Sequence, residues 1–185
     1  IFLIVLIASI IRNYYFLYKH SEYIMSEVNS KYYLVRKTKN KQAIANILGL
    51  IDTRLKTLIR HINQVKCSDQ ICNNIKLLAI RYQSLKLSEN IYMEDTSFTL
   101  NKNETMLCLA ARDKNEKIYD INKLMFVVLH EMGHVGSQSY GHNEEFVNLF
   151  TFLLEQSIDL GIYTYQDYKQ RPEEYCGIYI NQTPI

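Results

Sequence analysis

The chain has 185 residues, of which 48% are hydrophobic and 22% are charged, and it contains only two prolines. This length supports one full-sized hydrophobic core and is too short for two, and the composition excludes a disordered chain. The formal net charge of +2 at pH 7 is too small to indicate nucleic-acid binding over the whole surface, so the charge argues against nucleic acid as a partner.

The first eleven residues, IFLIVLIASII, carry no charge and are followed by Arg12. Eleven helical residues extend only about 16 Å, against about 30 Å for the core of a bilayer, so they cannot span a membrane alone. Because the chain begins with Ile1, we favour the end of a membrane anchor; a buried core helix and the end of a signal peptide are the alternatives. We therefore expect residues 1–20 to form an N-terminal apolar helix that ends a single-pass anchor, with the cytosolic side slightly favoured by Arg12 and Lys19.

Residues 21–185 are expected to form a single domain, which begins with a short strand at residues 32–36, YYLVR. An amphipathic helix follows at residues 41–66, where apolar side chains recur every three or four positions. Ser-Asp at residues 68–69 supplies an N-cap for a second helix, whose apolar positions continue at the same spacing to Leu85.

A β-hairpin is predicted next, with strands at residues 97–100 and 105–111. The turn-prone sequence Asn-Lys-Asn at residues 101–103 joins them. At the other end of the domain, residues 163–185 show no clear periodicity. We expect that tail to be irregular, with at most one short helix.

Two further helices lie between the hairpin and the tail. Asp120 caps the third helix, which should end near Gly136. Asn143 opens the fourth helix, and two glutamates follow it in the first turn, where the helix dipole favours negative charge. Gly161 is placed to end this helix.

The four cysteines contain no CxxC pair, which argues against a zinc ribbon or a thioredoxin-type redox site. They are Cys67, Cys72, Cys108 and Cys176. Their simplest interpretation is as buried thiols, because two disulfides would require an oxidising compartment.

Residues 129–146, LHEMGHVGSQSYGHNEEF, hold three of the five histidines. His130 and His134 are four positions apart on the predicted third helix, so their rings project from one face and can reach one ion. Zinc accepts neutral imidazole nitrogen at about 2.0 to 2.1 Å, and a catalytic zinc has three protein ligands and a water. Glu131 can point toward that water as a general base without binding the metal. This is the H-E-x-x-H arrangement.

His142 is the third ligand that we expect, because glycines at both ends of the connecting loop let the chain turn sharply and return to the metal. An acidic residue could take its place. Glu155 lies one or two turns deeper in the fourth helix, and Glu144 and Glu145 lie closer, although both also suit the first turn of a helix.

The segment HEMGHVGSQSYGHNEEF resembles the active-site segment of SprT-like and WLM-type zinc metallopeptidases, which have HExxH, a short loop, and Gly-His followed by an aromatic residue. More broadly, residues 96–184 look like uncharacterised metallopeptidase-like proteins of large DNA viruses. The shared features are the TSFTLNKNETMLCL hairpin, the DINKLMFVVLHEMGH helix and the final EYCGIYIN. The elongated metzincin motif is excluded, since Ser137 and Tyr140 stand where its glycine and third histidine would fall.

The resemblance implies a zincin-like α+β fold in which helices pack on a small, mostly antiparallel sheet. It implies Zn²⁺ as the cofactor, His130, His134 and His142 as its ligands, and Glu131 as the base. It also suggests that residues 105–111 line the cleft as a sheet edge, to which an extended peptide could add through main-chain hydrogen bonds.

We therefore predict a membrane-associated zinc metallopeptidase, an endopeptidase that acts on peptides or proteins through metal-activated water with Glu131 as general base. Candidate donors to the oxyanion are Tyr140, Tyr163 and Tyr165. One alternative is a membrane-anchored interaction protein with a non-catalytic zinc site. Another is a SprT-like protease that cleaves proteins attached to nucleic acid, although no second zinc module follows and an apolar segment precedes.

Overall fold

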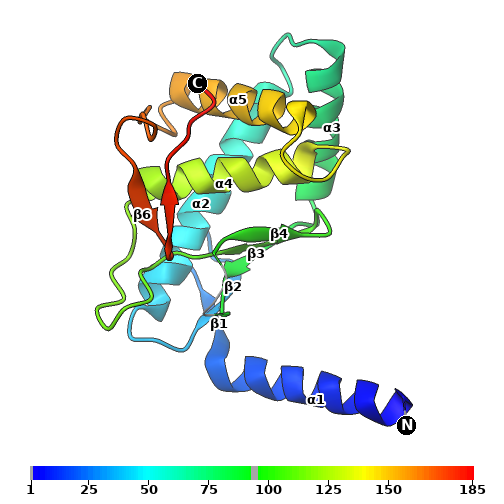
Figure 1. Ribbon diagram of the computed structural model, residues 1–185, viewed down its shortest axis with the longest axis vertical. Coiled ribbons are helices and arrows are strands. Elements are labelled where there is room, and N and C mark those ends of the chain that lie inside the picture. Colours follow the sequence, from blue (N-terminus) through cyan, green and yellow to red (C-terminus); the bar gives the residue numbers. More distant parts are fainter. Residues whose placement is uncertain (1, 93–95) are drawn as a thin grey trace.

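The computed structural model describes residues 2–92 and 96–185, and these form the α+β fold that was predicted. Four of its helices build the core: α2 (Lys41–Ile62), α3 (Asp69–Tyr82), α4 (Ile121–Gly136) and α5 (Glu144–Asp159). Helix α4 contacts each of the other three and also the strand β4 (Phe98–Leu100) (Figure 1). The helix that carries HEMGH therefore lies in the middle of the molecule.

The three predicted N-caps are confirmed, and α2 also begins at the predicted residue, although without a side-chain cap. Ser68 accepts a hydrogen bond from the backbone N–H of Ile71, and Asp120 and Asn143 cap α4 and α5 in the same way. Helix α2 ends at Ile62, a turn earlier than the sequence pattern indicated. Gly161 has a φ of +65° just beyond α5, which is the left-handed conformation that commonly ends a helix.

A three-stranded sheet lies beside α4, with the strand order β3-β5-β4. Strands β4 and β5 (Glu104–Leu107) form the predicted antiparallel hairpin, and the turn residues Asn101 and Lys102 both have positive φ. Strand β3 (Lys86–Glu89) pairs in parallel with β5, which the sequence did not indicate. Because β5 has a neighbour on each side, the expectation that residues 105–111 form a sheet edge is wrong.

Two further antiparallel pairs complete the strands of the described residues. Strand β1 (Ser21–Met25) pairs with β2 (Tyr32–Arg36), and only β2 was predicted. Strand β6 (Glu173–Tyr175) pairs with β7 (Ile178–Ile180), so the expectation of an irregular tail is wrong there. The turn between them places Cys176 and Gly177 at φ of 47° and 83°.

All four cysteines form disulfides, so their interpretation as buried thiols is wrong. One joins Cys67 to Cys72 in the connection between α2 and α3. The other joins Cys108, directly after β5, to Cys176 in the β6–β7 turn. These last two are 68 positions apart in the sequence, and only the fold brings their Cα atoms to 6.5 Å.

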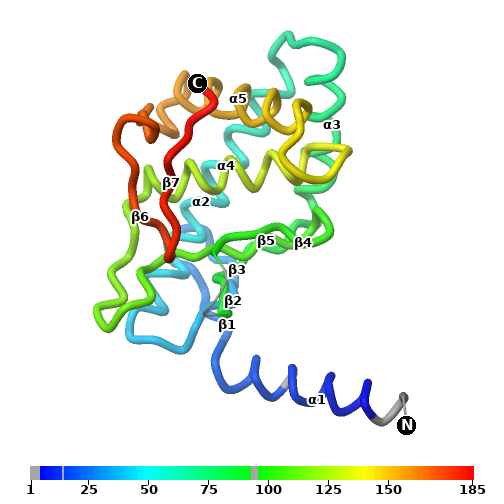
Figure 2. Tube along the Cα trace, viewed as in Figure 1, coloured from blue at the N-terminus to red at the C-terminus, as the bar shows by residue number. Residues whose placement is uncertain are grey.

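Helix α1 (Phe2–His20) extends away from the other helices at the N-terminal end (Figures 1 and 2). It is apolar only as far as Ile11, since Arg12 and Lys19 follow, so a long N-terminal apolar helix is not supported. Among residues 2–92 and 96–185 no helix has both the length and the apolar character needed to cross a membrane. This finding contradicts the expected single-pass anchor; Ile1 lies outside the described residues. The division into residues 1–20 and 21–185 stays a prediction.

Candidate metal centre

The structure brings the three predicted histidine ligands together. His130 and His134 lie on one face of α4, and His142 returns from the loop that precedes α5. Nε2 of His142 lies 3.1 Å from Nε2 of His130 and 3.1 Å from Nε2 of His134. Three nitrogens placed tetrahedrally at zinc–nitrogen bond length are about 3.3 Å apart. The two spacings to His142 are close to this value, and the three ligand nitrogens all lie within 4.8 Å of one another.

One aromatic ring packs against all three histidines. Phe146, in the first turn of α5, lies with its ring centroid 4.4 Å from that of His134, 4.8 Å from that of His142 and 4.9 Å from that of His130. Gly133 makes this approach possible, because a Cβ there would lie 2.8 Å from Cε2 of Phe146. A packed ring restricts the imidazole rotamers and so holds the three rings in place.

The end of α4 is held by two cations from other parts of the chain. Lys102 Nζ donates to the carbonyl oxygens of His134, Ser137 and Ser139 at 3.1, 2.8 and 2.6 Å. Arg81 Nη1 donates to the carbonyl of Ser137 at 2.8 Å and to that of Val135 at 2.6 Å. These carbonyls lack intrahelical partners, and positive charge is favourable at this end of a helix. Lys102 and Arg81 thus fix the loop that carries His142.

Glu145 holds the same loop from α5 and does not belong to the histidine cluster. Its carboxylate accepts hydrogen bonds from the backbone N–H of Gln138 at 2.7 Å and of Ser139 at 3.1 Å. Burial raises the pKa of Glu145, but these hydrogen bonds outweigh it and the pKa lies below its usual value. Glu144 and Glu155, the remaining acidic candidates for the third ligand, are also outside the cluster of His130, His134 and His142. Gly141, with a φ of +84°, provides the sharp turn that was expected before His142.

Glu131 is buried beside the histidines, with 4% of its surface exposed. Its Oε2 accepts a hydrogen bond of 2.7 Å from Oγ1 of Thr99, a residue of β4. Oγ1 of Thr99 also lies 3.1 Å from Oγ1 of Thr105, its register partner in β5. Burial raises the pKa of Glu131 to about 7, although the hydrogen bond from Thr99 opposes that change. Because Thr99 belongs to β4, the strand next to the candidate base is an edge strand of the sheet.

His130 and His134 are neutral at neutral pH in the metal-free protein. The pKa of His130 is lowered to about 3, mainly because burial desolvates the ring and also because the rings of His134 and His142 lie nearby. Desolvation also lowers the pKa of His134 to about 4, with further contributions from His142 and Lys102. Neutral imidazole is the form that coordinates a metal ion.

Two cavities meet at the cluster, and His130, Glu131 and His142 line both. The first, which we call the apolar cavity, has a volume of about 530 Å³ and lies between α4, α5 and residues 178–184. The second, the polar cavity, has a volume of about 400 Å³ and is bordered by β4 and by Lys102.

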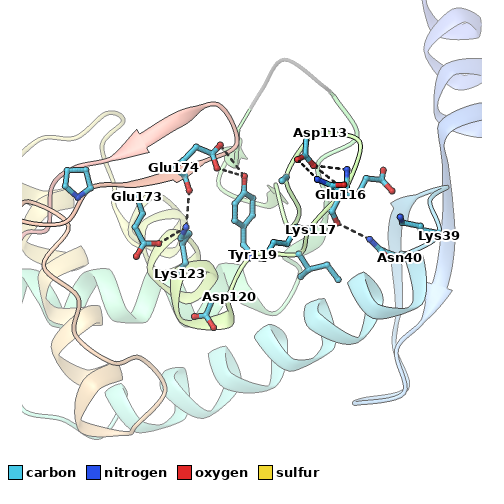
Figure 3. Close-up of a pocket in the computed structure, with 14 residues that line it drawn as sticks. Lys39, Asn40, Asp113, Glu116, Lys117, Tyr119, Asp120, Lys123, Glu173 and Glu174 are labelled. Carbon is cyan, nitrogen blue, oxygen red and sulfur yellow. Dashed lines mark hydrogen bonds and ion pairs between the residues drawn. The ribbon is translucent and has the colours of Figure 1, made fainter.

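A larger hollow of about 1360 Å³ lies elsewhere on the molecule (Figure 3). Its lining is mostly charged, and several of these groups already pair with one another: Lys123 Nζ lies 2.6 Å from Oε2 of Glu173, and Tyr119 donates to Glu174 at 3.2 Å. None of the described residues that line it is a histidine or a cysteine. The smaller cavities at the histidines are the better candidates for a chemical site.

The predicted tyrosine donors lie in three different environments. Tyr140 lines the polar cavity with 78% of its surface exposed, and its ring centroid lies 4.6 Å from Lys102 Nζ. Tyr163 is buried in the core, and Tyr165 lines a separate hollow. Tyr175, which the sequence did not single out, lines the apolar cavity and donates to the carbonyl of Cys108 at 2.7 Å.

Nothing in the sequence singled out Thr99 or Lys102 either. Both belong to the predicted hairpin, where a threonine in a strand and a lysine in a turn are ordinary residues. Their contacts with α4 cross 32 positions or more of the sequence. The tertiary structure was needed to find them.

Comparison with known proteins gives viral relatives. The chain is 38% identical over 186 residues to the uncharacterized protein R325 of Acanthamoeba polyphaga mimivirus, covering 97% of the chain and 94% of the relative. It is 29% identical over 170 residues to the uncharacterized protein 136R of Invertebrate iridescent virus 6, covering 78% and 90%. It is 37% identical over 98 residues to the uncharacterized protein 042R of Invertebrate iridescent virus 3, covering 52% and 57%. No protein-family model and no solved structure matches the chain. The expected likeness to proteins of large DNA viruses is confirmed.

Proposed function

This chain belongs to the family of large-DNA-virus proteins that includes R325 of Acanthamoeba polyphaga mimivirus, and we propose that it is a zinc-dependent peptidase. The proposal includes a zincin-like fold, as in the SprT-like and WLM-type metallopeptidases that the HEMGH segment resembles. The observation that carries it is the convergence of three imidazole nitrogens beside a buried carboxylate. That combination of three imidazole ligands and one adjacent base is what hydrolysis assisted by a metal requires.

His130, His134 and His142 would hold the ion. When bound, zinc supplies Lewis-acid chemistry, which polarises a carbonyl and makes water more acidic. Glu131 then accepts the proton of the attacking water and later delivers it to the leaving amine. Thr99 orients this buried carboxylate through the hydrogen bond to Oε2.

The substrate class that suits the site is an extended peptide or protein segment. Strand β4 lies at the edge of its sheet, and residues 96–99 border the polar cavity together with Glu131. A peptide that added to this edge through main-chain hydrogen bonds would pass the histidine cluster. Tyr140 is the best placed of the three predicted oxyanion donors, because it lines the same cavity as His142.

Two measurements test the proposal. The purified protein should contain one zinc per chain by mass spectrometry, and it should cleave members of a peptide library in a reaction that a chelator stops. Glu131→Gln should keep the zinc and lose cleavage. Glu155→Gln is the matched control, since it is an exposed glutamate of α5 outside the cluster, and it should keep both.

The outcomes separate the competing functions. Stoichiometric zinc without cleavage of any peptide would indicate a non-catalytic zinc site. Cleavage that requires added DNA and declines steeply with salt would favour the protease acting on proteins attached to nucleic acid. A folded protein without transition metal would refute the proposal.

A further inference from the structure

The apolar cavity has walls from two parts of the chain. Helices α4 and α5 contribute one wall and the C-terminal hairpin contributes the other. Figure 2 shows the trace of β7 passing α4. The helical wall consists of Phe126, Val127, Phe146, Val147 and Phe150. The opposite wall includes Ile178 and Ile180 of β7 and continues through residues 181–184. His130 and Glu131 line the same space, so it is continuous with the candidate metal centre.

Two hydroxyl groups and the one carboxylate in this cavity have partners, whereas Oγ1 of Thr183 has none among the described residues. Tyr175 OH donates to the carbonyl of Cys108 and is hydrogen-bonded with Ser97, and the Glu131 carboxylate accepts from Thr99. Among the described residues that line it, Glu131 is the only one of the Asp, Glu, Lys and Arg types. An anionic occupant would therefore be desolvated without a positive charge on the wall, and that costs free energy.

The wall formed by the hairpin is tied to the sheet. Cys176, in the turn that precedes β7, is linked by a disulfide to Cys108, directly after β5. Tyr175 adds a hydrogen bond to the same segment. These connections hold Ile178 and Ile180 opposite the helices before any ligand arrives, so the cavity is preformed.

We propose that the apolar cavity is the specificity pocket of this enzyme and that it takes the large apolar side chain, aromatic or long aliphatic, of a residue flanking the cleaved bond. The inference rests on the proposed peptidase function. A volume of about 530 Å³ lies within the range of about 300 to 1,000 Å³ that is typical of ligand pockets. A large side chain buries its surface against the phenylalanines and isoleucines, whereas alanine leaves most of that contact unmade.

The discrimination should be clear in cleavage rates. Apolar pockets discriminate by about ten- to 200-fold for each methylene group gained or lost. In a peptide library on the zinc-loaded protein, one position next to the cleaved bond should prefer Phe, Tyr, Leu or Met over Ala and Asp by more than about tenfold in kcat/KM. Equal cleavage across these residues would overturn the inference and leave the proposed function intact.

A substitution at the mouth of the cavity tests whether these walls cause the preference for large apolar side chains. Val147 lines the cavity with 41% of its surface exposed, so Val147→Trp can fill the space without disturbing the core. We expect kcat/KM for the peptide with Phe at this position to fall at least tenfold and that for its alanine counterpart to change less than twofold. Val28→Trp is the matched control, since Val28 is 49% exposed and lies outside the cavity, and it should leave both rates unchanged. Equal losses on both peptides would contradict the assignment.

A binding experiment decides the question without catalysis. N-acetyl-phenylalanine amide, titrated at millimolar concentration into methyl-labelled protein, should shift the resonances of Val147, Ile178 and Ile180 in a saturable way. N-acetyl-alanine amide should bind at least tenfold more weakly, and Val147→Trp should abolish the shifts. If these methyl groups respond but the zinc-loaded protein cleaves nothing, the proposed function fails while the apolar site stands. If neither compound shifts them, the pocket assignment is wrong.

Discussion

Thr99 donates a 2.7 Å hydrogen bond to Oε2 of Glu131 and so connects the edge strand β4 to the helix that carries His130 and His134, two of the candidate metal ligands. A hydrogen bond to a charged group contributes about 1.5 to 3 kcal/mol, and this one fixes the orientation of the candidate base. Thr99→Val keeps the shape of the side chain and removes the donor. We expect kcat to fall by about ten- to 100-fold with zinc content unchanged, measured on a cleaved peptide.

Thr99→Ser is the rescue variant, because it restores the hydroxyl group. It should recover most of the lost kcat, with KM close to that of the wild type. Equal losses in the valine and serine variants would mean that Thr99 acts through packing and not through its hydrogen bond to Glu131.

Lys102 should set the affinity for zinc although it is not a ligand. Its Nζ bonds three carbonyls at the start of the loop that carries His142, and Lys102→Met keeps the aliphatic stem while removing these bonds. Loss of groups that orient metal ligands costs about ten- to 100-fold in metal affinity. Competition with a chromophoric chelator measures this directly. Lys76→Met, at an exposed position of α3, should leave the affinity within about twofold of the wild-type value.

Gly133 should be intolerant of even one added carbon. The Cβ of Gly133→Ala would lie 2.8 Å from Cε2 of Phe146, the ring that packs against all three histidines. Overpacking of this kind costs about 1 to 3 kcal/mol of unfolding free energy, which urea denaturation of the metal-free protein can measure.

The double variant tests the cause of that loss. Phe146→Leu removes the atoms that the new methyl group meets, so Gly133→Ala should cost less in its presence than alone. Strictly additive losses would show that the glycine is required for a reason other than the approach of Phe146.

Zinc should stabilise the folded protein through the three histidines. A ligand that binds only the native state at 100 times its Kd adds about 2.7 kcal/mol to the free energy of unfolding. Thermal denaturation should therefore show a Tm that rises with zinc and returns to its original value with a chelator. His142→Ala should abolish this shift, whereas His20→Ala, a histidine outside the cluster, should preserve it. A shift of the same size in both variants would place the zinc elsewhere.

Because of Asp52, the stability of the α2 region should decrease as the pH becomes acidic. Burial raises the pKa of Asp52, but hydrogen bonds from Tyr82, Lys56 and Lys31 outweigh it, so the pKa lies below its usual value. At pH values near the pKa of Asp52, the unfolded chain therefore binds more protons than the native state. The stabilisation is complete above about pH 5 and is lost as the pH falls below about 4, through the native pKa.

Asp52→Asn tests this dependence because its amide oxygen still accepts from Tyr82. Urea denaturation between pH 3 and pH 6 should show a smaller decrease in stability for this variant than for the wild type. Asp159→Asn, at an exposed position of α5, should follow the wild-type curve. Parallel curves for Asp52→Asn and the wild type would contradict the prediction.

The local features of the fold were determined by the sequence. A spacing of four on one helix places His130 and His134 on the same face wherever that helix lies. Caps such as Asp120 and Asn143 act on N–H groups two or three positions away, so they too can be found in a short stretch of sequence. The return of His142 was predictable because its loop is short and contains Gly141.

Contacts between distant segments were decided only by the tertiary structure. Thr99 reaches Glu131, Lys102 reaches the end of α4, and Cys108 reaches Cys176, each across at least 32 positions of the chain. The parallel pairing of β3 with β5 was likewise decided only by the tertiary structure. Periodicity reports the direction of a side chain within its own helix or strand. Which two elements then meet depends on how all the apolar faces pack at once, and a single stretch of sequence does not contain that information.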